Sequence, residues 1–199
     1  MKSCLILSSF VLASGIAHAG VFQFDLQGTA GIGLLAGNEN GPVFGTPGVG
    51  GEIGAGILYD DVSNILMLNY GWGTGNGFAS NLTGAATANH IHGPTTSSGT
   101  GSFAQNAGVK YGIDSLFGYN SSAVAGGFSG TVNILEADEP SLLAGQFYVN
   151  VHTTANGGGE LRGNLVLTAV PEPAETVALT GGLIGAFALL RRYRCKNAK

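Results

Sequence analysis

Residues 145–170 have the clearest β-hairpin pattern of the chain, GQFYVNVHTTANGGGELRGNLVLTAV. Between Gln146 and Thr153 apolar and polar side chains alternate, which is the period of a half-buried β-strand. The run Asn156-Gly157-Gly158-Gly159 then predicts a turn, because Gly and Asn adopt positive φ at low cost. Residues 160–167 return as a second strand, so we expect a hairpin with one apolar face and one polar face.

The polar face of this hairpin predicts a structural cluster of side chains. Its members are Tyr148, Asn150, Glu160 and Arg162, with His152 beside them. Arg162 is the only arginine between the two ends of the chain. A guanidinium offers five donors in a fixed fork, so we expect Arg162 to be a buried or half-buried hub. We expect it to pair with Glu160, or with carbonyls of the His152 strand or of the loop at His90 and His92.

The rest of the chain reads as short strands separated by turns. It has 199 residues, 35 of them Gly without a three-residue period, which excludes collagen. A short helix is expected at 138–145, with an acid as its cap, Pro140 in its first turn and Gly145 at its end. About eight strands and no long helical pattern predict an antiparallel β-sandwich or barrel. The strands expected outside the hairpin are Val21–Gly28, Glu52–Tyr59, Ile65–Tyr70, Leu82–His92 and Phe128–Leu135.

The first 19 residues have the pattern of a signal peptide. Lys2 provides a positive start, residues 4–16 are mostly apolar, and Ala17-His18-Ala19 is a small-x-small cleavage site. We therefore expect an exported protein whose mature domain covers residues 20–169.

The last 30 residues, 170–199, predict a membrane-directed segment. Val170-Pro171-Glu172-Pro173 ends the last strand, because Pro cannot donate to a β-ladder. Residues 176–190 carry no charge and predict a short transmembrane helix of about 22 Å. Arg191, Arg192 and Arg194 follow and are expected to stay in the cytoplasm.

This order of parts resembles the PEP-CTERM sorting signal of Gram-negative bacteria. The resemblance implies recognition by an exosortase at the inner membrane, cleavage near the Pro-Glu-Pro box, and delivery to the cell surface or the extracellular matrix. The alternative is a plain C-terminal membrane anchor, which has a similar hydropathy pattern.

Charge and cysteine content restrict the partners of the predicted domain. Residues 20–169 contain ten acidic residues against two basic residues, which leaves a net charge of −8. Such a domain repels nucleic acid and anionic membrane surfaces. Both cysteines, Cys4 and Cys195, lie in the end segments, so the domain forms no internal disulfide.

Three histidines of the predicted domain form a candidate metal site. His90 and His92 are two residues apart on a predicted strand and therefore share a face, and His152 lies on the polar face of the hairpin. Three imidazoles with an open position suit copper or zinc. A hydrogen-bonded structural cluster and proton-transfer catalysis are the two alternatives, because spacing alone does not define the geometry.

Two segments of the sequence resemble the signature segments of the chordin-type CHRD domain family. They are HIHGP (90–94) and YVNVHTTANGGGELRGNL (148–165). FDLQG (24–28) and the acidic, Pro-containing stretch 37–56 also fit the opening of that family. The resemblance implies an antiparallel Greek-key β-sandwich, immunoglobulin-like or superoxide-dismutase-like, in an exported protein.

These features together predict a non-catalytic structural or binding module of the bacterial surface or matrix, with an unknown extracellular ligand. The competing hypothesis is a copper or zinc metalloprotein with redox activity as an option. Dismutase activity is rejected, because copper–zinc superoxide dismutase needs more histidines and a disulfide.

Overall fold

The structure is a computed structural model that describes residues 20–120 and 123–168. These residues form ten β-strands, one short α-helix and three short 3₁₀ helices. The strands are β1 (Val21–Gly28), β2 (Gly31–Ile32), β3 (Leu35–Ala36), β4 (Gly50–Asp60), β5 (Ile65–Trp72), β6 (Ala86–His92), β7 (Val109–Gly112), β8 (Gly126–Asn133), β9 (Tyr148–Thr153) and β10 (Leu161–Leu167). The α-helix is α1 (Glu139–Leu143), and the 3₁₀ helices are η1 (Thr74–Asn76), η2 (Gly99–Ser102) and η3 (Glu136–Asp138).

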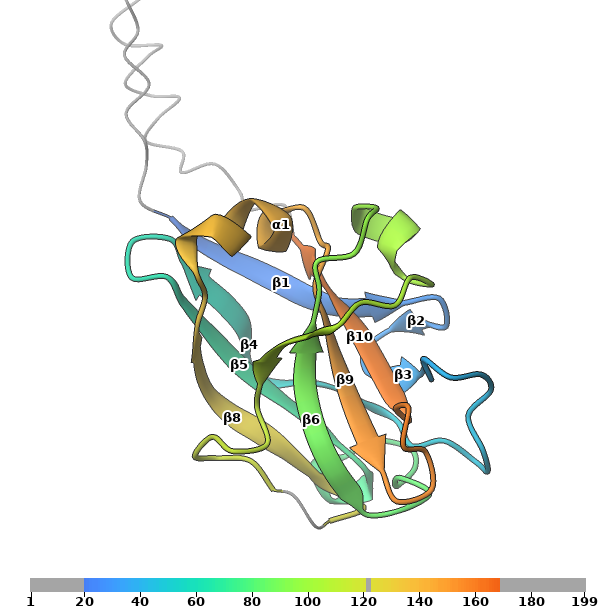
Figure 1. The fold of residues 1–199 in the computed structure, drawn as a ribbon. Helices are drawn as coiled ribbons and strands as arrows, with labels where there is room; N and C mark the ends of the chain where they lie inside the picture. The colour runs from blue at the N-terminus through green and yellow to red at the C-terminus, as the bar shows by residue number, and fades with distance from the viewer. Residues whose placement is uncertain (1–19, 121–122, 169–199) are drawn as a thin grey trace, which may run out of the picture.

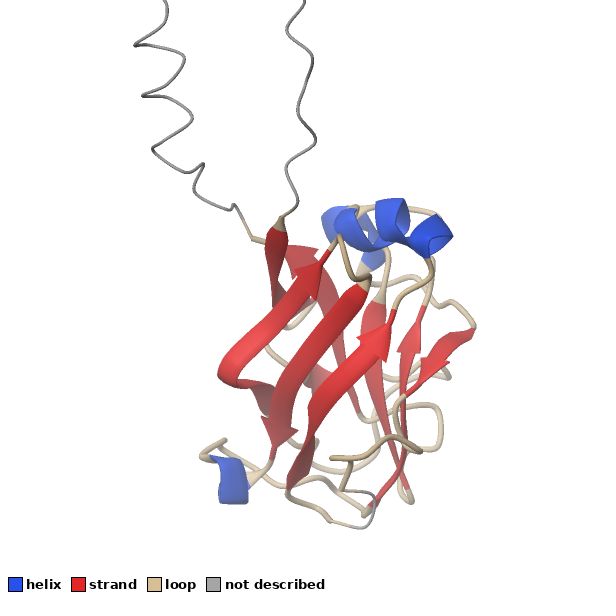
Figure 2. Ribbon diagram, turned by 90° about the vertical axis from the view of Figure 1, so that its left-hand side faces the viewer, coloured by secondary structure: helices blue, strands red, loops and turns tan. Residues whose placement is uncertain are grey.

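All ten strands belong to one antiparallel sheet. Their order is β7-β6-β9-β10-β1-β4-β5-β8, with β2 beside β1 and β3 beside β10. The sheet curls round, so that β6, β9 and β10 lie across from β4, β5 and β8, and the fold is nearly barrel-shaped (Figure 1, Figure 2). The predicted all-β antiparallel architecture is confirmed, whereas the type of sandwich stays a prediction.

The core fills the inside of this curled sheet. Tyr59, Tyr70, Trp72 and Phe128 are all less than 2% exposed. The ring of Tyr70 lies 6.1 Å from that of Phe128 and 6.4 Å from that of Trp72, centroid to centroid. Each fully buried aromatic side chain stabilises the fold by about 1.5–3 kcal/mol relative to an exposed one. The predicted apolar face of the hairpin also joins this core.

The strand limits differ from the predicted ones where glycine changes the backbone. The β4–β5 hairpin is longer than expected and contains a β-bulge between Glu52 and Ile57. Gly54 and Gly56 adopt φ of 57° and 71° there, which only Gly does without strain. β6 begins at Ala86 rather than Leu82, and β7 was not expected, because four residues are too few for a visible alternation.

The predicted helix is present but its cap differs. α1 has Pro in its first turn, and Gly145 ends the segment at φ 70° as expected. Asp138 precedes the helix without a side-chain capping hydrogen bond, so the expectation of an acidic cap is wrong. Its carboxylate instead accepts a hydrogen bond from Tyr111 and pairs with Lys110 at 3.0 Å.

Both predicted targeting segments lie outside the described residues. This applies to the signal peptide, 1–19, and to the sorting residues Pro171, Glu172, Pro173, Arg191, Arg192 and Arg194. Within the described part of the chain, every helix is too short or too polar to cross a membrane.

Candidate metal centre

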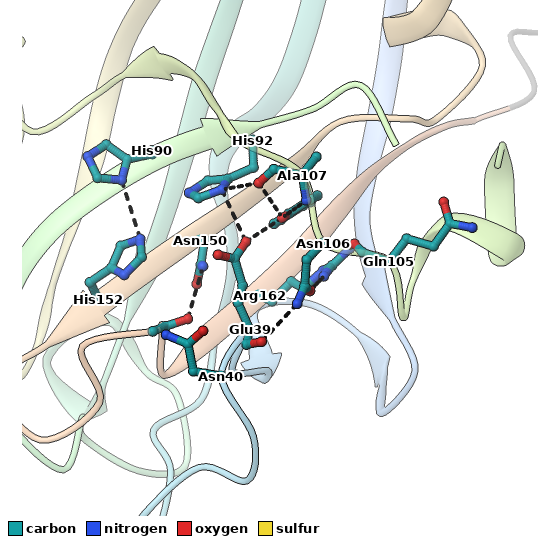
Figure 3. A network of polar contacts seen from close by, with 12 residues as sticks. Glu39, Asn40, His90, His92, Gln105, Asn106, Ala107, Asn150, His152 and Arg162 are labelled. Carbon is teal, nitrogen blue, oxygen red and sulfur yellow. Dashed lines mark hydrogen bonds and ion pairs between the residues drawn. The ribbon is translucent and has the colours of Figure 1, made fainter. Parts of the chain in front are cut away.

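β6 and β9 bring the three histidines onto one face of the sheet. In the antiparallel register His90 lies opposite Asn150, and Ala88 lies opposite His152. The three ring centroids are 5.1 Å (90–152), 5.7 Å (90–92) and 5.8 Å (92–152) apart. One nitrogen from each ring lies within 4.8 Å of the other two, and the rings face a common point (Figure 3). The structure therefore brings together His90, His92 and His152, the three histidines that the sequence predicted as a candidate site.

Hydrogen bonds determine which nitrogen of His92 carries the hydrogen. Its Nδ1 lies 2.9 Å from the carbonyl oxygen of Ala107 and 3.1 Å from Oε1 of Glu39. Both partners only accept, so Nδ1 donates and Nε2 keeps its lone pair. The His92 side chain is 3% exposed, and Nε2 has no hydrogen-bond partner among the described residues. An unpaired buried acceptor costs roughly 1–3 kcal/mol.

His152 has the same arrangement in a partly buried position. Its Nδ1 lies 2.9 Å from the carbonyl oxygen of Gly157, so Nδ1 donates and Nε2 carries the lone pair. That Nε2 lies 3.3 Å from Nδ1 of His90. Metal-binding histidines typically use one ring nitrogen for the ion and donate the other N–H to a carbonyl or a carboxylate.

Burial favours the neutral form of the site. Burial is the main cause that lowers the pKa of both His90 and His92, and the neighbouring His152 lowers both further. Glu39 partly opposes this by raising the pKa of each of the two. Neutral imidazole is the form that binds metals, and burial favours this form in His90 and His92.

Tyr148 joins the histidines to Arg162. Its ring stacks on His92 at 5.1 Å with an interplanar angle of 24°, and the guanidinium carbon of Arg162 lies 3.6 Å from the ring centroid. The hydroxyl donates to Glu39. Burial and this hydrogen bond raise the pKa of Tyr148, so the phenol keeps its proton.

Arg162 is a buried hub, as predicted. It is 8% exposed, and its Nη2 donates to the carbonyl oxygens of Ser102 (3.0 Å) and Gln105 (2.7 Å). Nη1 donates to Asn106 at 3.3 Å, and Nε donates to Asn164 at 3.2 Å. One guanidinium thus fixes the loop 102–106 over the outer face of β9 and β10, which Figure 3 shows from close by.

The predicted pairing of Arg162 with Glu160 is wrong, since no ion pair joins them within residues 20–120 and 123–168. The buried Glu160 carboxylate accepts from four neutral donors: Gly48 N (3.0 Å), Thr83 N (2.7 Å), Thr153 Oγ1 (2.9 Å) and Asn156 Nδ2 (3.2 Å). β10 begins one residue later, after Gly159 at φ 108°. Glu160 therefore holds the loops at the end of the sheet and takes no part in the histidine site.

Asn150 lies between the histidines and Arg162, with His90 opposite it on one side and Arg162 on the other. It is fully buried, and its Nδ2 lies 3.5 Å from the carbonyl oxygen of Gly158. Its Oδ1 has no hydrogen-bond partner among the described residues. Asn150 is thus a second buried acceptor without a donor on this face.

Sequence reasoning missed the acceptors that hold the histidine rings. Glu39 and Ala107 lie on loops, and Asp114 places its Oδ2 3.7 Å from Nε2 of His90. Loop residues have no periodicity that predicts their orientation. The only signal for Glu39 was its place in the acidic stretch 37–56.

These features define an all-β domain with a buried polar network and a histidine cluster on the outer face of its sheet. The CHRD domain matches residues 34–165, and the chain belongs to this family. Comparison with curated proteins and with solved structures gives no match. The predicted resemblance is confirmed for the CHRD domain.

Proposed function

We propose that this protein is an exported, non-catalytic structural or binding module of the surface or extracellular matrix of a Gram-negative bacterium. The observation that supports it best is the Arg162 hub, because the polar side chains around it hold loops against the sheet. Membership of the CHRD family agrees with such a role. The Greek-key sandwich, immunoglobulin-like or superoxide-dismutase-like, is part of the same proposal.

Export and sorting are proposed from the two end segments. A signal peptide at 1–19 starts export, the helix 176–190 holds the chain in the inner membrane, and an exosortase cleaves near Pro171-Glu172-Pro173. In a host with an exosortase, mass spectrometry of the surface protein should show that the segment after about Pro173 is lost. Detection of Lys199 on the mature surface protein would contradict sorting and favour a plain anchor.

A second candidate function is binding of copper or zinc, with redox activity as an option. It is favoured by one observation, the convergence of three imidazole nitrogens within 4.8 Å. The full-length chain, purified and analysed for metal, should retain about one ion, and His92→Asn should retain none. Thr87→Ala, an exposed position on the same strand, is the control. Equal metal content in His92→Asn and the control would reject this function.

A further inference from the structure

The ring of His90 faces two acceptors, and a bound cation would change which of them receives its hydrogen. Its Nδ1 faces Nε2 of His152 at 3.3 Å, and its Nε2 faces Oδ2 of Asp114 at 3.7 Å. Both partners are acceptors, because His152 donates from its other nitrogen. A neutral imidazole has a single N–H, so one of the two contacts is left without a hydrogen. With a cation bound among the rings, Nε2 of His90 carries the hydrogen and points it at Asp114. The lone pairs of His90 Nδ1 and His152 Nε2 then both bind the ion.

The distances between the rings fit such an ion. Two nitrogens bound to one ion at about 2.0–2.1 Å in a tetrahedral site lie roughly 3.3–3.4 Å apart. His90 Nδ1 and His152 Nε2 already have this separation. One nitrogen of each ring lies within 4.8 Å of a nitrogen of the other two, and the third histidine, His92, is the one with a buried, unpaired Nε2.

We propose that this site binds copper through His90 Nδ1, His92 Nε2 and His152 Nε2, with Glu39 as the residue that positions His92. The inference rests on the second candidate function and specifies its metal and its ligand atoms. Neutral nitrogen donors bind Cu²⁺ more tightly than Zn²⁺ in the general order of divalent metal affinities. Three protein ligands leave a coordination position for water or another small ligand.

Glu39 is held in place by its own backbone as well as by its side chain. Its N–H donates to the carbonyl oxygen of Gly158 at 3.0 Å, and its carbonyl oxygen accepts from Asn106 at 2.8 Å. Its carboxylate accepts from the Tyr148 hydroxyl and faces Nδ1 of His92. A carboxylate at this place fixes the ring orientation and makes Nε2 a stronger ligand. Glu39 thus acts on the metal through His92 without touching it.

The first test compares copper and zinc on the full-length chain stripped of metal. Copper is expected to bind at one site and to displace zinc, and the Cu²⁺ spectrum in electron paramagnetic resonance should show coupling to imidazole nitrogens. That spectrum should be lost or changed in His90→Asn, His92→Asn and His152→Asn, and unchanged in Thr87→Ala. Zinc binding more tightly than copper would overturn the assignment of the metal while leaving metal binding intact.

The second test separates positioning from simple structural support. Glu39→Ala is expected to weaken copper binding by about 10- to 100-fold, which is the usual effect of removing such an outer partner, and to change the copper spectrum. Glu136→Ala removes an exposed carboxylate and should change neither. A Glu39→Ala protein that unfolds earlier but binds copper like the wild type would overturn the role of Glu39. If no variant differs because no metal binds at all, both the copper site and the second candidate function are wrong.

Discussion

At the scale of single residues, the outer face of β9 and β10 is unusual because its polar side chains are buried. Tyr148, Asn150 and Asn164 are fully buried, and Arg162 is almost so. The alternation of the hairpin predicted that Tyr148, Asn150 and Arg162 share this face, whereas Glu160, predicted beside Arg162, binds the loops at the end of the sheet. It also predicted that Arg162 is a hub, from the scarcity of basic residues. It did not identify the partners of Arg162, because these lie on the loop 102–106, whose position follows from tertiary contacts.

Replacement of Arg162 tests the hub. In Arg162→Ala the carbonyl oxygens of Ser102 and Gln105 lose their donor, and the unpaired buried acceptor at Ser102 alone costs roughly 1–3 kcal/mol. Arg162→Lys should also lower the free energy of unfolding, because an ammonium cannot reproduce the fork. Lys110→Ala is the control, since it removes the other basic side chain of residues 20–169 while Asp138 keeps its hydrogen bond from Tyr111, and a smaller loss is expected. Denaturant midpoints equal to the wild-type value in both Arg162 variants would mean that the residue stabilises nothing.

The pH dependence of stability tests the burial of the histidines. Burial lowers the pKa of His90 and His92 in the folded state below the ordinary value of about 6.5, which both keep in the unfolded chain. As the pH falls through about 6.5 the unfolded state therefore takes up more protons than the folded state, and stability decreases until the lowered folded pKa is passed. The metal-free protein should show falling denaturant midpoints from about pH 7.5 to pH 5.5. The decrease should be smaller in His90→Asn, and a wild-type midpoint that stays constant would contradict this account.

At the scale of elements, the turn between β9 and β10 links the histidine strand to the Arg162 strand. Its glycines were predicted to form a turn, and they do. Two of them also leave room for neighbours: Gly158 packs against Asn38 and Asn40, and Gly159 packs against the Asn150 amide. The sequence predicted the turn, because Gly and Asn have a local preference. The packing of the loop 38–40 on it depends on long-range contacts, which a local pattern does not contain.

Gly159→Ala should destabilise the domain. Gly159 has φ of 108°, a strained conformation for any other residue, and a Cβ atom there would collide with the Asn150 side chain. Strain of this kind costs about 1–3 kcal/mol before the collision is counted. Gly157→Ala is the matched control, since nothing lies within 4 Å of its Cβ position, and it should lose no stability. Similar melting temperatures for the two variants would show that the turn tolerates a side chain at both places.

At the scale of the whole molecule, the pairing of β6 with β9 makes the site. The sequence predicted that His90 and His92 share a face, and that His152 lies on a polar face of its own strand. It contained no information on the register of the two strands, which are far apart in the chain. The same holds for Glu39 and Ala107, which approach from loops on the outer face of the sheet (Figure 3). Fold class and the three histidines of the cluster were therefore predictable, while the orientation of their nitrogens and the partners of the rings required the structure.

The most direct test of the metal site is a crystal structure of the protein grown with copper, with diffraction data collected on both sides of the copper absorption edge. We expect one anomalous peak at about 2.0–2.1 Å from His90 Nδ1, His92 Nε2 and His152 Nε2. Nδ1 of His92 should still face Glu39 and Ala107 in that structure. A peak at any other place, or the three rings arranged as here with no peak between them, would show that these histidines do not form a copper site.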